Sequence, residues 1–238
     1  MPGAGLLFTK QIVKHILKGN FGVLTQVHYY SRWKGTLQPF RSAITDRCPW
    51  LSFPAIDFLE GHLPARAKVF EYGGGGSTLF FLAKGARVIT VEHDQDWFKR
   101  LQTAIPSDSL ARWEGHLIKP ERAENTMKLD KSRPEDYYSG NKDFRRATFR
   151  DYCRFITAFG DEYFDLVLID GRARSSCLYH AGSKVKPGGW LVLDNAERPH
   201  YLENNLHIGE PMFRLVLDKL AAVPYDPFFS KTSIWQRK

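Results

Sequence analysis

Four consecutive glycines, Gly73 to Gly76, interrupt this chain where a short apolar segment gives way to a helical one. Residues 68–72 predict a strand and residues 77–84 predict a helix. Because glycines lack side chains, the backbone between the two can adopt positive φ and approach a ligand closely. The following helix offers free N–H groups at its start, so the bend is either a binding loop or a plain tight turn.

Strands and helices alternate along the rest of the chain. Further strands are predicted at residues 87–91, 110–118, 164–169, 190–193 and 232–236, and helices at 55–61, 94–104, 149–159, 177–185 and 213–221. This alternation predicts an α/β fold with a doubly wound, mostly parallel sheet and helices on both faces. Ligands of such sheets bind beyond the carboxyl ends of the strands, so the residues that follow strands are the candidates for function.

The beginning of the chain has a different pattern. Residues 1–66 predict a helical or irregular extension, and residues 67–238 predict the α/β domain. Within the extension, residues 6–18 predict an amphipathic helix whose apolar side is Leu6, Ile12, Val13, Ile16 and Leu17 and whose basic side is Lys10, Lys14 and Lys18. Such a helix packs on the domain or lies on an anionic membrane surface. Residues 31–54 and 119–147 predict irregular segments.

Composition narrows the class of protein. A chain of 238 residues is long enough for one domain with its own core. Its three cysteines have no paired spacing, which favours reduced thiols over disulfides or zinc ligands. No apolar run approaches the ~18 residues needed to span a bilayer, and the first residues lack the charged start of a signal peptide. We therefore expect a cytoplasmic protein.

The net charge of +8 admits nucleic acid, anionic lipid or an acidic substrate as a partner. The basic residues do not form one long tract; residues 118–133 and 142–154 are the densest stretches. This spread favours a solvated surface of mixed charge over a nucleic-acid footprint.

Two carboxylates frame the glycine bend. Glu71 directly precedes the glycines, where it suits an amino-bearing ligand better than a pyrophosphate, which it would repel. Glu92 ends the second predicted strand, where a carboxylate can accept hydrogen bonds from both hydroxyls of a ribose. The pair indicates a nucleoside ligand that carries an amino group.

These residues resemble the first motif of the class I S-adenosylmethionine-dependent methyltransferases, which has an acidic residue, a spacer and alternating glycines. Glu71, Gly73 and Gly75 match it in order, and Ser77 replaces the third glycine. The segments FDLVLIDG, with Asp170 at a strand tip, and PGGWLVLDN match two further motifs. The resemblance covers about residues 66–238. It implies a Rossmann-like, seven-stranded sheet that binds S-adenosylmethionine and transfers its methyl group.

The resemblance also implies a set of cofactor-binding residues. They are Glu71, Tyr72, Gly73, Gly74, Gly75, Ser77, Glu92, His93 and Asp170. The chain is further similar to a bacterial subgroup of the family, and the residues that carry this likeness are Pro49, Trp50, Pro54, Ala55, Ile56, Val91, Glu92, His93, Asp94, Trp97, Ile169, Asp170, Gly171, Arg172, Arg174, Cys177, Asp194, Asn195, Arg198 and Tyr201.

The chemistry of methyl transfer points to residues at two strand tips. A sulfonium methyl is already electrophilic, so the enzyme mainly holds the acceptor in line and excludes water. An oxygen acceptor also needs a base or a metal to remove its proton. The catalytic candidates are Asp170, Asp194, Arg172 and Arg198. The arginines can clamp a carboxylate or phosphate of the substrate, or pair with neighbouring acids.

Other groups could take the acceptor's proton. Catechol O-methyltransferases hold magnesium with two aspartates and an asparagine after these strands, which implies Mg²⁺ on Asp170, Asp194 and Asn195. The spacing is shorter in this chain, so Asp170 can instead orient the methionine amino group of the cofactor. His93, His180 and His200 are further candidate bases because histidine titrates near neutrality.

Three functions remain open at this point. The first is O-methylation of a small-molecule or glycan-like acceptor, with an anionic acceptor as the sharper hypothesis. The second is an NAD(P)-binding Rossmann oxidoreductase, because Gly73, Gly75 and Thr78 approximate its glycine fingerprint. The third is a non-catalytic nucleic-acid-binding protein that uses the positive surface. The position of Glu71 beside the phosphate site argues against the second.

Overall fold

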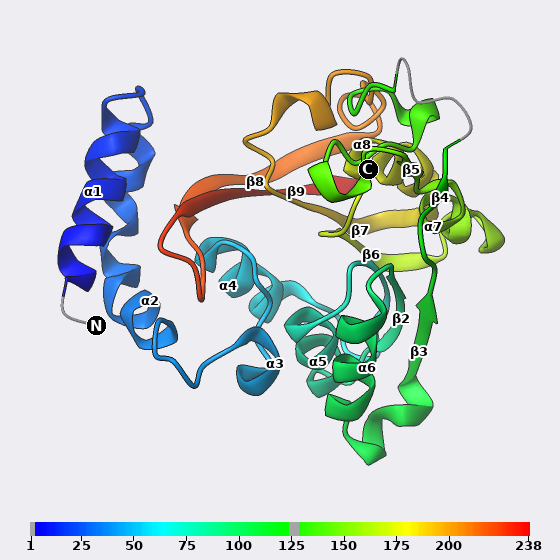
Figure 1. Cartoon of the computed structure of the whole chain (residues 1–238), viewed down its shortest axis with the longest axis horizontal. Helices are drawn as coiled ribbons and strands as arrows, with labels where there is room; N and C mark the ends of the chain where they lie inside the picture. Colours follow the sequence, from blue (N-terminus) through cyan, green and yellow to red (C-terminus); the bar gives the residue numbers. More distant parts are fainter. Residues whose placement is uncertain (1–2, 124–128) are drawn as a thin grey trace.

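A seven-stranded sheet forms the centre of the computed structural model, which describes residues 3–123 and 129–238 (Figure 1). The spatial order of its strands is β3, β2, β1, β6, β7, β9, β8. Their bounds are β1 Lys68–Tyr72, β2 Arg87–Glu92, β3 Trp113–Leu117, β6 Phe164–Ile169, β7 Val185–Asp194, β8 Phe213–Ala222 and β9 Phe229–Arg237. In this spatial order, the neighbouring strands from β3 through β2, β1 and β6 to β7 pair in parallel, whereas β9 runs antiparallel to β7 and β8. The predicted doubly wound, mostly parallel sheet is confirmed.

Side chains of the central strands alternate between two cores, one on each face of the sheet. In β6, Leu166 and Leu168 belong to the first core, and Val167 and Ile169 to the second. The first core is covered by α4 Phe53–His62, α5 Gly76–Ala83 and α6 Gln95–Ala104, and the second by α7 Arg150–Arg154 and α8 Arg174–Ala181. Burial on both faces explains why this strand is continuously apolar from Leu166 to Ile169.

Several short elements complete the chain. A two-stranded ribbon pairs β4 Glu121–Arg122 with β5 Ala147–Thr148. The 3-10 helices after the first strand are η2 Ser107–Arg112, η3 Pro134–Asp136, η4 Lys142–Phe144, η5 Phe155–Ala158, η6 Gly182–Lys184 and η7 Pro199–Tyr201. All three cysteines are free.

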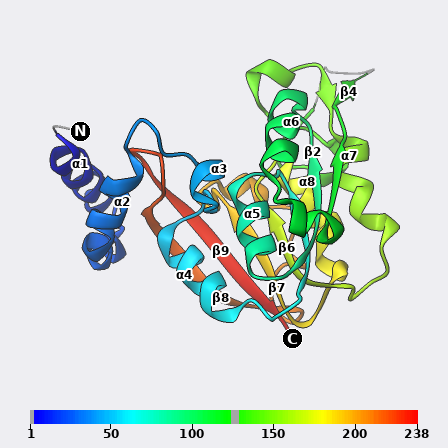
Figure 2. The same ribbon diagram turned by 90° about the horizontal axis from the view of Figure 1, so that it is seen from below.

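The N-terminal helices lie beside the β8–β9 hairpin (Figures 1 and 2). They are α1 Ala4–Ile16, η1 Phe21–Tyr29, α2 Tyr30–Thr36 and α3 Ala43–Asp46. The rings of Phe8 and Phe229 lie 5.1 Å apart, and Trp33 Nε1 donates to the Asp226 carbonyl at 2.8 Å. The extension therefore shares the first core with the sheet. Within the described residues, no helix combines the length and apolarity that crossing a bilayer requires.

The structure corrects three predictions of secondary structure. Residues 213–221 were predicted as a helix but form most of β8, because pairing with β9 outweighs a leucine spacing that also suits a helix. Residues 31–54 are less irregular than predicted, since they contain α2 and α3. The apolar side predicted for the first helix is right only for Ile12, which is buried, and Ile16, which packs against the first core. The buried residues of this helix are Ala4, Phe8, Gln11, Ile12 and His15, whereas Leu6, Val13 and Leu17 are exposed.

Candidate functional site

The glycine bend joins β1 to α5 and is fixed by close packing. Gly73 has φ of +87°, which favours glycine. A side chain on Gly74 would collide with Thr90, and one on Gly76 would collide with the Cys48 carbonyl. The Trp97 indole donates to the Gly74 carbonyl at 2.6 Å. The missing side chains thus serve packing against the protein's own backbone and hold the loop in one conformation.

Glu71 supports the bend from behind. Its carboxylate is fully buried and accepts hydrogen bonds from Ser77 Oγ at 2.7 Å, from Thr90 Oγ1 at 2.8 Å and from Thr78 Oγ1. Burial raises the pKa of Glu71 to about 7, although the three hydroxyls lower it in part. Its oxygens therefore fix the first turn of α5. The prediction that Glu71 contacts the ligand directly is corrected, because it does not line the cavity described below.

Tyr72 also lies away from the cavity. Its ring is fully buried in the second core, and its hydroxyl donates to the Cys153 carbonyl at 2.6 Å. Side chains alternate along a strand, so Tyr72 and Glu71 occupy opposite faces of β1. Tyr72 was predicted among the cofactor-binding residues, but its side chain does not reach the cavity.

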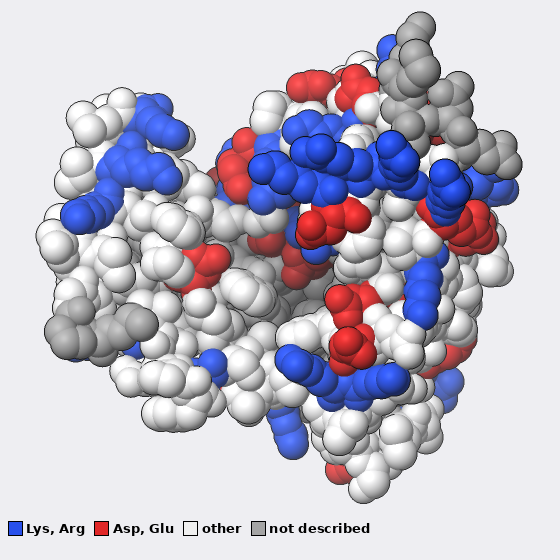
Figure 3. Space-filling model, in the orientation of Figure 1, with Lys and Arg blue, Asp and Glu red and all other residues white. Residues whose placement is uncertain are grey.

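A cavity of about 740 Å³ opens at the carboxyl ends of the parallel strands. It is visible as the central hollow in Figure 3, which has acidic atoms within it. Its volume lies within the range of small-molecule sites. The N-terminal extension contributes Ala43 and Trp50 to its wall, and the β8–β9 hairpin contributes Phe228 and Phe229. From the domain come Gly73, Gly74, Gly75, Gly76, Ser77, Glu92, His93, Asp94, Trp97, Asp143, Phe144, Asp170, Gly171, Arg172, Asp194, Asn195, Glu197 and Arg198.

Acidic side chains outnumber basic ones in the lining of this cavity. Seven acidic residues line it, against the two arginines Arg172 and Arg198. The acidic residues are Glu92, Asp94, Asp143, Asp170, Asp194, Glu197 and Asp226. A concave, mostly acidic wall attracts cations and repels anions.

Glu92 faces the glycine bend, as predicted. Its Oε2 accepts the Gly74 N–H at 3.2 Å, while Oε1 accepts the N–H groups of His93 at 2.6 Å and Asp94 at 2.8 Å. His93 Nδ1 lies 2.7 Å from the same Oε1. Because a carboxylate oxygen has two lone pairs, Oε2 can accept one more hydrogen bond. The arrangement thus leaves room for one ribose hydroxyl, whereas the sequence suggested two.

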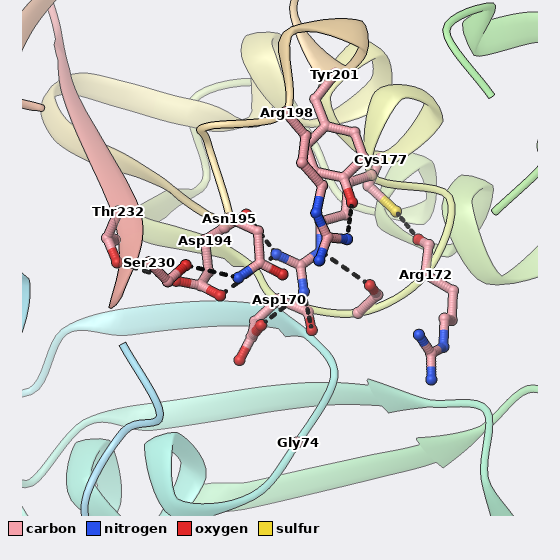
Figure 4. A network of polar contacts seen from close by, with 12 residues as sticks. Gly74, Asp170, Arg172, Cys177, Asp194, Asn195, Arg198, Tyr201, Ser230 and Thr232 are labelled. Atoms are coloured by element: carbon pink, nitrogen blue, oxygen red, sulfur yellow. Dashed lines mark hydrogen bonds and ion pairs between the residues drawn. The ribbon is translucent and has the colours of Figure 1, made fainter. Parts of the chain in front are cut away.

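The buried Arg174 joins the tips of β6 and β7 through Asp170 and Asp194, which are labelled in Figure 4. Arg174 Nη2 donates to Asp170 Oδ1 at 2.9 Å, and Arg174 Nη1 lies 3.5 Å from Asp194 Oδ2. The remaining donors reach the backbone carbonyls of Gly171, Asp170 and Asp194. Four hydrogen bonds and the ion pair with Asp194 thus hold the guanidinium within the protein, which favours a structural role over a clamp on a substrate.

The two aspartates differ in how much of each carboxylate is free. Burial and the nearby Asp194 raise the pKa of Asp170 well above its usual value, although Arg174 lowers it in part. One Asp170 oxygen pairs with Arg174, and the carboxylate is 24% exposed to the cavity. Asp194 is more enclosed, because Thr232 Oγ1 donates to it at 3.0 Å and Arg174 covers its other oxygen. Asp170 is therefore the more available of the two.

The residues predicted to hold magnesium do not fit that ion. Arg174 already supplies a positive charge between Asp170 and Asp194. The Asn195 amide nitrogen donates to Ser230 Oγ at 2.8 Å. Across residues 3–123 and 129–238, no three His, Cys, Asp or Glu side chains gather as a metal site.

A second, smaller pocket of about 430 Å³ adjoins the acidic cavity. It shares Gly171, Arg172, Asn195 and Arg198 with that cavity, and its other lining residues are Lys131, Ser139, Gly140, Asn141, Ala173, Arg174, His200 and Tyr201. No acidic residue is among these described residues, so we call it the basic pocket. The positive charge of its lining favours an anionic ligand.

The basic pocket combines residues that the sequence suggested with others that it did not. Arg172 Nε lies 3.3 Å from His93 Nε2, and Arg198 Nη1 donates to the Tyr201 hydroxyl at 3.0 Å. Both guanidiniums keep further N–H donors. Lys131 was not predicted, and His200 was predicted only as a general base. Burial lowers the pKa of His200, with Lys131 and Arg198 as further causes.

Comparisons with known proteins give a fold but no close relative. No protein-family model matches this sequence, and no protein of curated function matches it. Among solved structures, an O-methyltransferase from Bacillus cereus in complex with SAH is similar at 15% identity and a TM-score of 0.53, over 91% of this chain and 100% of that one. This is a class I methyltransferase fold.

Two further solved structures share this methyltransferase fold. TrmN from Thermus thermophilus matches at 14% identity and a TM-score of 0.52, over 88% of this chain and 53% of that one. A putative rRNA-methylase from Clostridium thermocellum matches at 11% identity and a TM-score of 0.51, over 76% and 92%. Identities this low extend the likeness to the methyltransferase fold and no further. The Rossmann-like fold expected from the sequence motifs is thereby confirmed.

Proposed function

We propose that this protein is an S-adenosylmethionine-dependent methyltransferase. The observation that carries the proposal is the acidic cavity beside the glycine bend of a methyltransferase fold. A sulfonium cofactor is positively charged at sulfur, so seven carboxylates against two arginines favour its binding. The pyrophosphate of NAD(P) would meet the same carboxylates and be repelled, which argues against the oxidoreductase alternative.

The residues that line the cavity suit the parts of this cofactor. Glu92 Oε2 can accept a ribose hydroxyl, and the free oxygen of Asp170 can accept the ammonium group. The bend from Gly73 to Ser77 forms the floor between them. When bound, S-adenosylmethionine supplies an electrophilic methyl group. In this proposal residues 67–238 form the cofactor domain, while residues 1–66 help to close the cavity and exclude water through Ala43 and Trp50.

We further propose an anionic acceptor, small-molecule or glycan-like, that is methylated on oxygen. Arg172 and Arg198 stand where the acidic cavity meets the basic pocket, so they can hold a carboxylate or phosphate while the hydroxyl faces the cofactor. Asp194 also lines the cavity, and burial raises the pKa of its carboxylate, so it is the proton acceptor that we assign to that hydroxyl. The free thiols favour the cytoplasm as the compartment of this reaction.

Calorimetry with S-adenosylhomocysteine tests the cofactor. We expect the folded wild type to bind it and to leave NADH unbound at the same concentration. Asp170→Asn should weaken binding, whereas Asp161→Asn should not, because Asp161 pairs with Lys184 and does not line the cavity. Folded wild type that takes NADH and not S-adenosylhomocysteine would overturn the proposal.

A radiolabelled methyl-transfer screen tests the acceptor. Cell lysate is separated on an anion exchanger, and each fraction is offered to the enzyme with labelled S-adenosylmethionine and to Glu92→Gln as the inactive control. We expect label in the retained, anionic fractions, and we expect it to survive nuclease. Label confined to the unretained fraction would contradict the anionic acceptor and leave the cofactor proposal standing. Loss of label after nuclease treatment would instead identify a nucleic acid.

A further inference from the structure

The N-terminal helices have an unusual charge pattern. Residues 1–45 contain six Lys or Arg and no Asp or Glu. Arg32 pairs with Asp57 and Arg41 pairs with Asp46. No ion pair between described residues includes Lys10, Lys14 or Lys18. The positive charges of these three lysines, which lie on α1 and just after its last residue, are therefore not neutralised by an ion pair.

The outer face of α1 is apolar as well as basic. Phe8 and Ile12 are buried on the inner face, whereas Leu6, Val13 and Leu17 are exposed, Leu17 to 82%. At 100° per residue these three lie within one narrow sector, next to Lys10 and Lys14. A helix that shows leucines to solvent beside lysines has the pattern of an interfacial helix.

The neighbouring η1 repeats the pattern. Phe21, Leu24 and Val27 are each more than half exposed, while Val23 and Gln26 are buried. A 3-10 helix has three residues per turn, so positions three apart line a single face. Because α1 and η1 pack against each other, their exposed faces belong to one lobe, which is white and blue in Figure 3. We call Leu6, Val13, Leu17, Phe21, Leu24 and Val27, together with Lys10, Lys14 and Lys18, the lobe surface.

We propose that the lobe surface docks the protein reversibly on an anionic lipid bilayer. The apolar side chains would enter the boundary between headgroups and acyl chains, and the lysines would face anionic headgroups. A second copy of the chain would bring the same uncompensated lysines together, which repel one another. A nucleic acid would satisfy the lysines but leave six apolar side chains in water. An anionic bilayer satisfies both groups, and this inference is independent of the proposed methyl transfer.

Sedimentation of the full-length protein with vesicles tests the proposal. We expect binding to vesicles of phosphatidylcholine and phosphatidylglycerol, much weaker binding to phosphatidylcholine alone, and a decrease with added salt. Leu17→Glu/Leu24→Glu should reduce the partition coefficient at least tenfold. Leu206→Glu is the matched control, since Leu206 is also 82% exposed and lies outside the lobe surface, and it should bind like the wild type. Thermal melting curves confirm that each variant is folded.

A second pair of variants separates charge from apolar contact. Lys10→Glu/Lys14→Glu should abolish the preference for anionic vesicles, whereas Arg214→Glu, a charge reversal on β8, should preserve it. Wild type that fails to sediment with anionic vesicles would overturn the proposal. So would unchanged binding of Leu17→Glu/Leu24→Glu, or light scattering that shows a dimer dissociated by that same double variant, which would identify a second copy as the occupant.

Discussion

The acidic cavity and the basic pocket are neighbours that share four residues but carry opposite charge. Carboxylates outnumber arginines seven to two in the first, whereas the described lining of the second contains no acid. Arg172 and Arg198 stand at the junction of the two. Because the two linings carry opposite charge, they can hold a cationic ligand and an anionic ligand in adjacent places at the carboxyl edge of the sheet.

Arg174 maintains this separation. It donates four hydrogen bonds within the protein and leaves one oxygen of Asp170 available to the cavity. Arg172, two residues earlier, has no carboxylate partner within the described chain and retains donors for a ligand. Of these two arginines in one loop, one therefore has a structural role, and we propose that the other binds a ligand.

The largest effect is expected from removing the buried guanidinium. Arg174→Met leaves Asp170 and Asp194 buried without a cation, which costs about 3–5 kcal/mol of unfolding free energy. Arg172→Met, as the control, should cost less than about 1 kcal/mol, because it breaks no ion pair. Urea denaturation measures both. A loss below about 1 kcal/mol for Arg174→Met would show that the guanidinium does not hold the two strand tips together.

The next effect concerns the acidic cavity. Glu92→Gln replaces one oxygen of a carboxylate that accepts backbone N–H groups and, in the proposed complex, a ribose hydroxyl. Hydrogen bonds to charged groups contribute about 1.5–3 kcal/mol. We therefore expect the dissociation constant for S-adenosylhomocysteine to rise about 10–100-fold in calorimetry. Glu197→Gln, which removes a half-exposed carboxylate from the same lining, should change it less than about threefold. Equal effects of the two substitutions would contradict a specific role for Glu92.

A smaller effect, on acceptor binding alone, should distinguish the role of the basic pocket from that of the acidic cavity. Arg198→Ala removes one charge-assisted contact to an anionic acceptor, so KM for the acceptor should rise about tenfold with little change in kcat. Its affinity for S-adenosylhomocysteine should stay within about twofold of the wild type. Arg214→Ala serves as the control because Arg214 lies on β8 and bonds to Gln236. Methyl-transfer kinetics with the active anionic fraction measure KM and kcat. Weaker binding of S-adenosylhomocysteine by Arg198→Ala would show that the cavity and the basic pocket are one site.

The smallest effect is a pH dependence of stability that arises from Glu71, which lies behind the glycine bend. The pKa of Glu71 is raised by burial from 4.5 to about 7, so its protonated form is favoured in the folded state. The stability that it contributes is complete below pH 4.5 and is lost as the pH rises through about 7. Glu71→Gln should flatten this part of the profile of melting temperature against pH, while the exposed Glu60→Gln should leave it unchanged. An identical slope in both variants would argue against a raised pKa.

Sequence reasoning located the site because parallel strands bring their carboxyl ends to one edge. It thereby gathered Gly73, Glu92, Asp170 and Arg172 around one cavity. The same reasoning failed for Glu71, because strand periodicity alternates side chains between two faces without showing which face a ligand approaches. The hydroxyls of Ser77 and Thr78, one turn later, were the available sign that Glu71 has partners inside the protein.

Other features of the site and the fold could not be predicted, because they depend on contacts between segments that lie far apart in the sequence. Lys131 comes from a segment without periodicity, and η7 brings His200 into the basic pocket only after the chain leaves β7. Residues 213–221 became a strand because β9 was available to pair with them. Such pairings are decided by tertiary packing, which overrides the local preference of a short apolar segment.

A crystal structure with S-adenosylhomocysteine tests the division of the two regions most directly. We expect the nucleoside in the acidic cavity, with a ribose hydroxyl within hydrogen-bond distance of Glu92 Oε2 and the amino group at Asp170, and with the basic pocket still open beside Arg198. A nucleoside lodged in the basic pocket, or a ribose turned away from Glu92, would contradict the account.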